Sequence, residues 1–148
     1  MACTIRVGGE HAEFLAITIL HRSRPGSSDY WDANWLRATV EVAAGGFHGE
    51  VHGDLRALEL ASFHRELLPL AESLSGVARF FTMEEWLSID ISADGRGHIE
   101  LSCTVRDALG GGNSLAARLE LDQTYLVPMI AQLERAMLEF PVIGRRHA

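Results

Sequence analysis

The chain has 148 residues, 47% hydrophobic and 22% charged, which are the size and composition of one folded domain and not of a disordered chain. Twenty acidic residues oppose 13 basic ones, all of them arginine, giving a net charge of -7. This balance argues against electrostatic binding of nucleic acid, which needs a basic stripe, and the lack of lysine excludes a lysine Schiff base or a P-loop lysine.

Alternation of apolar and polar residues predicts four strands in the first part of the chain. Residues 4–7 and 13–21 are expected to form a hairpin around two glycines. Residues 35–42 and 47–55 are expected to form a second hairpin, turning at Gly45 and Gly46. Residues 23–33 between the two hairpins are predicted to be the longest irregular loop.

Helical spacing of apolar residues follows over residues 60–74, and a stop is expected at Gly76. Pro69 lies inside this segment and is expected to kink it. Residues 77–83, 86–91, 98–106 and 115–121 then alternate again and predict four more strands. A second helix is predicted over residues 126–140, with a cap at Asp122 or Thr124 and a stop at Pro141.

These elements predict an α+β fold: an antiparallel β-meander of about seven or eight strands with two amphipathic helices packed on one face. No linker divides the chain, so we expect a single domain over residues 1–148, with 141–148 as a flexible tail.

The location expected for the protein is the cytoplasm. The short apolar run at 14–20 follows acidic residues, unlike a secretory signal, and no apolar run approaches membrane-spanning length, so no membrane association is expected. Cys3 and Cys103 do not make a disulfide framework, and both are expected to be reduced. In the predicted strand Cys103 faces the core.

A metal-like pattern occurs at His48, Glu50, His52 and Asp54, which share one face of a predicted strand. His48 and His52 would lie about 13 Å apart along the strand, too far to share one ion. A site would need His98 or His21 from another strand. The alternatives are a solvated strand face, with no cofactor, or a small-ligand or metal-binding domain that uses His48, Glu50, His52 and His98.

We find no catalytic residues in the sequence and expect a protein that is not an enzyme. The adjacent acids Glu84 and Glu85 would point to opposite faces, so they are expected to be solvated turn acids. The glycines at 110–112 precede a strand and not a helix, which argues against a phosphate loop. No Gly-x-Ser-x-Gly motif is present.

Aromatic residues gather in the segment from Asp29 to Trp35. Tyr30, Trp31 and Trp35 alternate there with acidic residues, and Trp35 and Trp86 fall on the polar side of their strands. Tryptophan and tyrosine are frequent hot spots in protein interfaces, so Asp29, Tyr30, Trp31, Asp32, Trp35 and Trp86 are the candidate partner-binding residues. The alternative is that the aromatic rings cover a sheet edge or fill a small second core.

The sequence also resembles a small bacterial family that includes WapI-type immunity proteins. The residues that carry the resemblance are Asp32-x-Asn34-Trp35-Leu36, Phe47-x-Gly49, Leu60-x-x-Phe63-x-x-x-Leu67, Gly76, Met83-Glu84-Glu85-x-Leu87, Gly95-x-Gly97-His98 and Asp122-Gln123-Thr124-Tyr125-Leu126. They run from about residue 29 to 140 and leave the first 28 residues outside. The resemblance implies a non-enzymatic cytoplasmic protein that binds and neutralises a contact-dependent toxin, often a nuclease.

The leading hypothesis is therefore a protein-interaction module, and more specifically an immunity protein. An acidic inhibitor would complement a basic toxin domain, because complementary charge speeds association. Homodimerisation through a sheet face is a weaker possibility.

Overall fold

The computed structural model describes residues 1–9 and 13–145. The first four strands form one antiparallel sheet in the order β1-β2-β3-β4, and a single helical turn, α1, precedes β3. The bounds are β1 (Cys3–Gly8), β2 (Phe14–Arg22), α1 (Tyr30–Ala33), β3 (Trp35–Ala44) and β4 (Phe47–Arg56).

The second sheet is a four-stranded antiparallel meander in the order β5-β6-β7-β8. Helix α2 connects it to the first sheet, and a short 3-10 turn, η1, leads from it into helix α3. The bounds are α2 (Ala57–Ser73), β5 (Ser75–Phe81), β6 (Leu87–Asp94), β7 (His98–Ala108), β8 (Gly111–Asp122), η1 (Gln123–Tyr125) and α3 (Leu126–Glu139).

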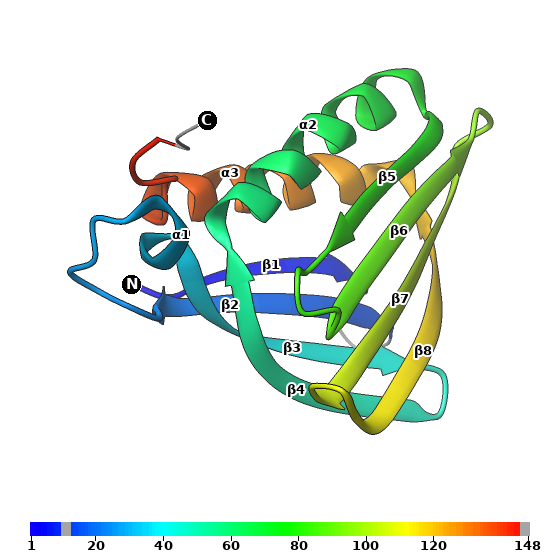
Figure 1. The fold of residues 1–148 in the computed structure, drawn as a ribbon. Helices are drawn as coiled ribbons and strands as arrows, with labels where there is room; N and C mark the ends of the chain where they lie inside the picture. The colour runs from blue at the N-terminus through cyan, green and yellow to red at the C-terminus, as the bar shows by residue number, and fades with distance from the viewer. Residues whose placement is uncertain (10–12, 146–148) are drawn as a thin grey trace.

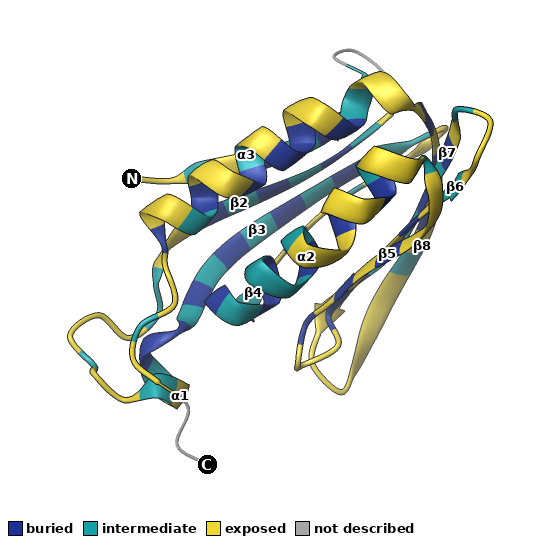
Figure 2. Ribbon diagram, turned by 90° about the horizontal axis from the view of Figure 1, so that it is seen from above, coloured by how far each residue is buried: buried dark blue, intermediate teal, exposed yellow. Residues whose placement is uncertain are grey.

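The two sheets are set at an angle to each other, and the two long helices lie together across the space between them (Figure 1). Strands β3 and β4 approach β8 and β7 where the sheets meet, while α3 packs beside β1, and α2 beside β5. The buried sides of both helices face the sheets and their exposed sides face away (Figure 2). One hydrophobic core therefore takes residues from both sheets and both helices.

The prediction of an α+β fold with eight antiparallel strands is confirmed. Alternation along the chain does not indicate where one sheet ends, and the strands divide because α2 lies between β4 and β5. Helix α2 continues through Pro69 without a break. It ends at Ser73 and is capped by Leu74, which adopts the left-handed conformation (φ 54°) two residues before the expected glycine.

The second helix agrees closely with its prediction. The Asp122 carboxylate accepts a hydrogen bond from the Thr124 backbone N–H and so caps η1, and α3 follows directly. The helix ends at Glu139, and Phe140 caps it immediately before Pro141. No helix in residues 1–9 and 13–145 is both long and apolar enough to cross a membrane.

Both cysteines are free thiols, and Cys103 lies in the core as predicted. Burial raises the pKa of Cys103 to about 11, which keeps this thiol protonated at neutral pH.

Candidate functional site

The aromatic segment predicted to be irregular contains the single helical turn α1. The Asp29 carboxylate caps this turn, accepting from the backbone N–H groups of Trp31 and Asp32 at 3.1 Å each. The rings of Tyr30 and Trp31 meet edge to face, with centroids 5.0 Å apart, and Trp31 is 49% exposed. Asp32 forms an ion pair with Arg24 at 2.7 Å. These contacts hold the exposed indole of Trp31 on an ordered turn.

Asn34, directly after α1, anchors the C-terminal segment. Its buried side-chain amide donates to the Tyr30 and Ile143 carbonyls at 2.7 and 3.0 Å, and accepts from the Ile143 backbone N–H at 2.8 Å. The Arg22 guanidinium donates to the carbonyls of Ala33 and Pro141, and burial lowers the pKa of Arg22. Pro141 and Ile143, expected to belong to a flexible tail, are therefore hydrogen-bonded to the body of the molecule. Residues 146–148 of that tail lie outside the described residues.

Trp35 lies on the outward face of the first sheet, as its alternation predicts, and is half-buried. In the β3–β4 register it stands opposite Arg56, whose guanidinium carbon lies 5.8 Å from the centre of the ring. The next outward pair is Arg37 and Asp54, joined by an ion pair of 3.7 Å.

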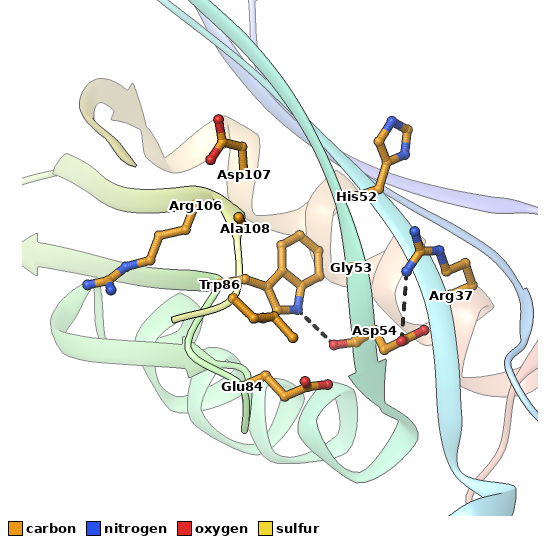
Figure 3. A pocket seen from close by; sticks show the side chains of 10 residues that line it. Arg37, His52, Gly53, Asp54, Glu84, Trp86, Arg106, Asp107 and Ala108 are labelled. Atoms are coloured by element: carbon orange, nitrogen blue, oxygen red, sulfur yellow. Dashed lines mark hydrogen bonds and ion pairs between the residues drawn. The ribbon is translucent and has the colours of Figure 1, made fainter. Parts of the chain in front are cut away.

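The prediction that Trp86 lies on the polar face is wrong, because this side chain is only 2% exposed. Trp86 precedes β6 and belongs to a turn, so the alternation of the strand does not extend to it. Its indole N–H donates to the Asp54 carbonyl at 2.7 Å, on the free edge of β4, and its ring lies against Gly53 (Figure 3). Trp86 thus belongs to the contact between the two sheets. Because its side chain is buried, Trp86 is no longer a candidate partner-binding residue.

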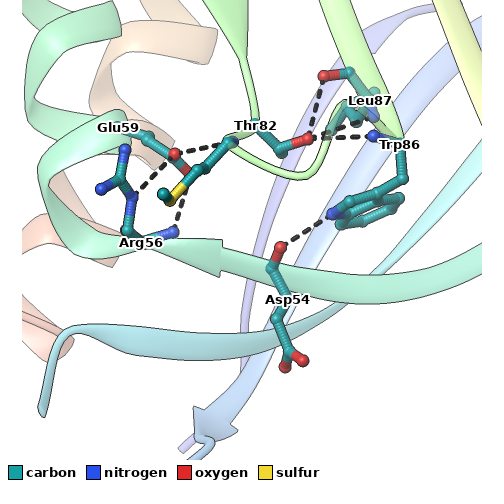
Figure 4. A network of polar contacts seen from close by, with 7 residues as sticks. Asp54, Arg56, Glu59, Thr82, Trp86 and Leu87 are labelled. Carbon is teal, nitrogen blue, oxygen red and sulfur yellow. Dashed lines mark hydrogen bonds and ion pairs between the residues drawn. The ribbon is translucent and has the colours of Figure 1, made fainter. Parts of the chain in front are cut away.

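The turn between β5 and β6, residues 82–86, is held by the buried side chain of Thr82. Its hydroxyl lies 3.2 Å from the Trp86 backbone N–H and 3.3 Å from that of Leu87, and it accepts from both. Glu85 adopts a left-handed backbone conformation (φ 61°), and its N–H donates to the Thr82 carbonyl at 3.0 Å. The turn is therefore closed on itself (Figure 4).

A buried carboxylate, Glu59, joins the same turn to the start of α2. Glu59 accepts from the Arg56 backbone N–H at 2.8 Å, from the Arg56 Nε at 3.0 Å and from the Met83 backbone N–H at 3.0 Å. The side chain is almost fully buried, and all its recorded partners are donors (Figure 4). Through it, α2, the end of β4 and the turn are fixed relative to one another.

Two pockets lie side by side at the free edge of β4 and share the residues Asp54 and Glu84. The larger has a volume of about 430 Å³ and is lined by Ser23, Arg24, Trp35, Asp54, Met83 and Glu84. The smaller, of about 120 Å³, is lined by residues of β3, β4, the 82–86 turn, the end of β7 and the β7–β8 turn (Figure 3). The larger pocket thus brings Trp35 next to the turn between β5 and β6. Arg24 lines the same pocket and forms an ion pair with Asp32 of α1, so α1 also lies near this turn.

The four residues of the metal-binding alternative are not brought together. His48 pairs with Glu41 at 2.7 Å, and His52 lies 3.9 Å from Glu50, all on the outward face of the first sheet. His98 begins β7 in the other sheet, opposite Asp122. Within the described ranges no group of three or more histidine, cysteine, aspartate or glutamate residues could hold a metal ion.

Met83, Glu84 and Glu59 also belong to this region, although the sequence pattern did not mark them as candidate residues. Glu84 and Glu85 are exposed, as expected of turn acids, and Met83 is 62% exposed. The sequence feature that could have indicated a surface site is a methionine beside two acids in a short turn. That this turn lies beside Trp35 is decided by the fold.

Comparison with known proteins gives a match to the immunity protein WapI-like family over residues 6–141. The match begins within β1, so the resemblance assigned from residue 29 onward was too short at its N-terminal end. No curated protein matches the chain. Because the family match covers nearly all of the sequence, the chain belongs to the WapI-like immunity protein family.

Proposed function

We propose that this protein binds a protein toxin and neutralises it without catalysis, in the cytoplasm of a bacterial cell. The observation that carries the proposal is the family match, which extends from β1 to Pro141, two residues after α3. An immunity protein acts by occupying its toxin, so its function requires an ordered binding surface and no reactive group.

We place the binding surface on α1, Trp35 and residues 83–85, which together we call the α1–turn surface. It presents exposed side chains of Trp31 and Met83 on two turns that internal hydrogen bonds hold in place. Large side chains on an ordered backbone lose little conformational entropy on binding, which favours their use as interface anchors. Asp29 and Asp32 support this surface through the cap and the ion pair with Arg24.

The net charge of -7 favours a basic toxin domain as the partner. Complementary charge raises the association rate, and this gain falls as salt screens the charges. We therefore expect the association rate with the toxin to fall as the salt concentration is raised.

The test is co-expression with the toxin domain encoded by the neighbouring gene. Cells that make the toxin together with this protein should grow, cells that make the toxin alone should stop growing, and the two proteins should copurify. A neighbouring gene that encodes no toxin, or a toxin that kills cells despite this protein, would contradict the proposal.

The α1–turn surface is tested with Trp31→Ala. We expect at least a tenfold rise in Kd for the inactivated toxin, since buried tryptophan anchors in interfaces are worth about 2 kcal/mol or more. Phe47→Ala is the matched control, because Phe47 is an aromatic side chain 71% exposed at the opposite end of the β3–β4 hairpin from Trp35. Equal effects of the two substitutions would place the binding surface elsewhere.

Homodimerisation through a sheet face remains a prediction, and sedimentation of the protein without toxin tests it. A monomer that binds one toxin molecule is the simplest arrangement for the α1–turn surface, because that surface is then available in every copy.

A further inference from the structure

The larger pocket at the edge of β4 has an uneven distribution of charge. Two of the charged residues that line it have partners: Arg24 pairs with Asp32 at 2.7 Å, and Asp54 pairs with Arg37 at 3.7 Å. Glu84 also lines the pocket, and in the described part of the chain its carboxylate makes no hydrogen bond or ion pair. Of the three charged residues in the lining, Glu84 is thus left without a partner among the described residues.

The walls beside that charge are apolar. The half-buried ring of Trp35 forms one side of the pocket, and the exposed Met83 another. An aromatic face next to a carboxylate is a favourable place for a planar cation, which gains a cation–π contact and a charge-assisted hydrogen bond at the same time.

The backbone that carries the unpaired carboxylate is also held in place. Met83, the residue before Glu84, donates its backbone N–H to the buried Glu59, and Glu85, the residue after it, donates to the Thr82 carbonyl. A turn held on both sides loses little freedom when a ligand binds, so the pocket is preorganised.

From these observations we infer that the pocket of Trp35, Met83 and Glu84 receives an arginine side chain of the toxin. The guanidinium donates two hydrogen bonds to the Glu84 carboxylate and packs against the part of the Trp35 ring that lines the pocket, while Arg56 keeps its own contact with that ring. Arginine fits better than lysine, because its plane matches both the ring and the carboxylate. This inference rests on the proposed function and names the chemistry by which the toxin is recognised.

The experiment measures the Kd of a catalytically inactivated toxin domain for the full chain and three variants, at about 0.15 M salt. We expect Glu84→Gln to raise Kd about tenfold and Glu84→Lys about a hundredfold, through loss and reversal of one charge-assisted contact. Glu72→Lys is the control. It makes the same change in net charge on an exposed position of α2, 13 residues, or about 20 Å of helix, beyond Glu59. We expect it to change Kd less than threefold.

The control separates the pocket from the overall charge. Equal effects of Glu84→Lys and Glu72→Lys would overturn the inference and leave the proposed function standing. A wild-type chain that does not bind the toxin would overturn both. Because the Glu84 carboxylate makes no hydrogen bond or ion pair within the described chain, its variants should melt at the wild-type temperature. Glu84→Gln keeps the size of the side chain if Glu84→Lys does not fold.

Arginine is tested from the toxin side by replacing its surface arginines singly with lysine. We expect one substitution to weaken binding to the wild-type chain but to add little to the effect of Glu84→Gln, as is the case for two groups in contact. Full additivity at every toxin arginine would overturn the inference.

Discussion

Trp86 and Gly53 meet where the two sheets come together, and each requires the other. The indole occupies the space above the Gly53 backbone, and a Cβ atom built there would lie closer than 3.0 Å to three ring carbons. The indole N–H pairs with the carbonyl of the next residue, Asp54. A buried tryptophan with its N–H satisfied adds a large apolar contact at no polar cost. Glycine at position 53 is what makes room for it.

Substitution of Gly53 tests this contact. We expect Gly53→Ala to lower the free energy of unfolding by about 1–3 kcal/mol, because the added methyl group would come too close to the Trp86 ring. Urea denaturation followed by tryptophan fluorescence measures the change. Gly46→Ala is the control, since a Cβ there meets nothing within 4 Å. Equal stability of the two variants would contradict the close packing described here.

At the scale of elements, Glu59 connects three parts of the fold with one side chain. Both of its oxygens accept hydrogen bonds, from the Arg56 backbone and side chain and from the Met83 backbone. Burial of a carboxylate is costly unless donors surround it, and here each recorded partner is a donor. The β5–β6 turn therefore owes its position to a residue on α2 as well as to its own hydrogen bonds.

Glu59→Gln tests that connection while it keeps the volume of the side chain. An amide places an N–H₂ donor where one carboxylate oxygen accepted, so at least one donor loses its partner. We expect a loss of about 1–3 kcal/mol in unfolding free energy and faster hydrogen exchange at the Met83 amide. Glu72→Gln, on the exposed side of the same helix, is the control. Unchanged exchange at Met83 would show that the turn does not depend on Glu59.

Across the whole molecule, opposite charges are interleaved on the outer faces of the sheets. Arg37 pairs with Asp54 on the first sheet, and Arg118 pairs with Glu100 at 2.8 Å on the second. Further carboxylates serve in turns, where they accept hydrogen bonds from backbone or side-chain donors. Hydrogen bonds to the charged form lower the pKa of a carboxyl group. They do so at Asp94 (chiefly from the Arg96 N–H), Glu100 (from Arg118), Asp107 (from Asn113) and Asp122 (from Thr124).

These pKa values predict a loss of stability in acid. A carboxyl group whose pKa is lower in the folded than in the unfolded chain stabilises the fold above its unfolded pKa. That contribution is lost as the pH falls through the folded pKa. We expect the melting temperature to fall as the pH is lowered below about 4. The combined variant Asp94→Asn, Asp107→Asn and Asp122→Asn should show a shallower fall. An equally steep fall would mean that other groups control the acid response.

Local patterns in the sequence were sufficient for most of the architecture. Alternating residues give a strand one buried and one exposed side, and this periodicity marks β3, β6, β7 and β8 whatever their partners are. The spacing of leucines marks both long helices for the same reason. The division into two sheets has no such local signature, because it depends on the position of β5 relative to β4 after the chain has passed through α2.

The residues of the candidate site divide in the same way. The exposure of Trp31 follows from a polar loop and the outward position of Trp35 from strand alternation, both of which neighbouring residues reveal. The burial of Trp86 and the placement of Glu84 beside Trp35 depend on contacts between segments about 30 to 50 residues apart in the chain. Such contacts form only when the two sheets pack at β4, and no periodicity within either segment encodes them. Composition and local pattern thus determined the elements and their faces, while the packing of the two sheets decided which side chains share a pocket.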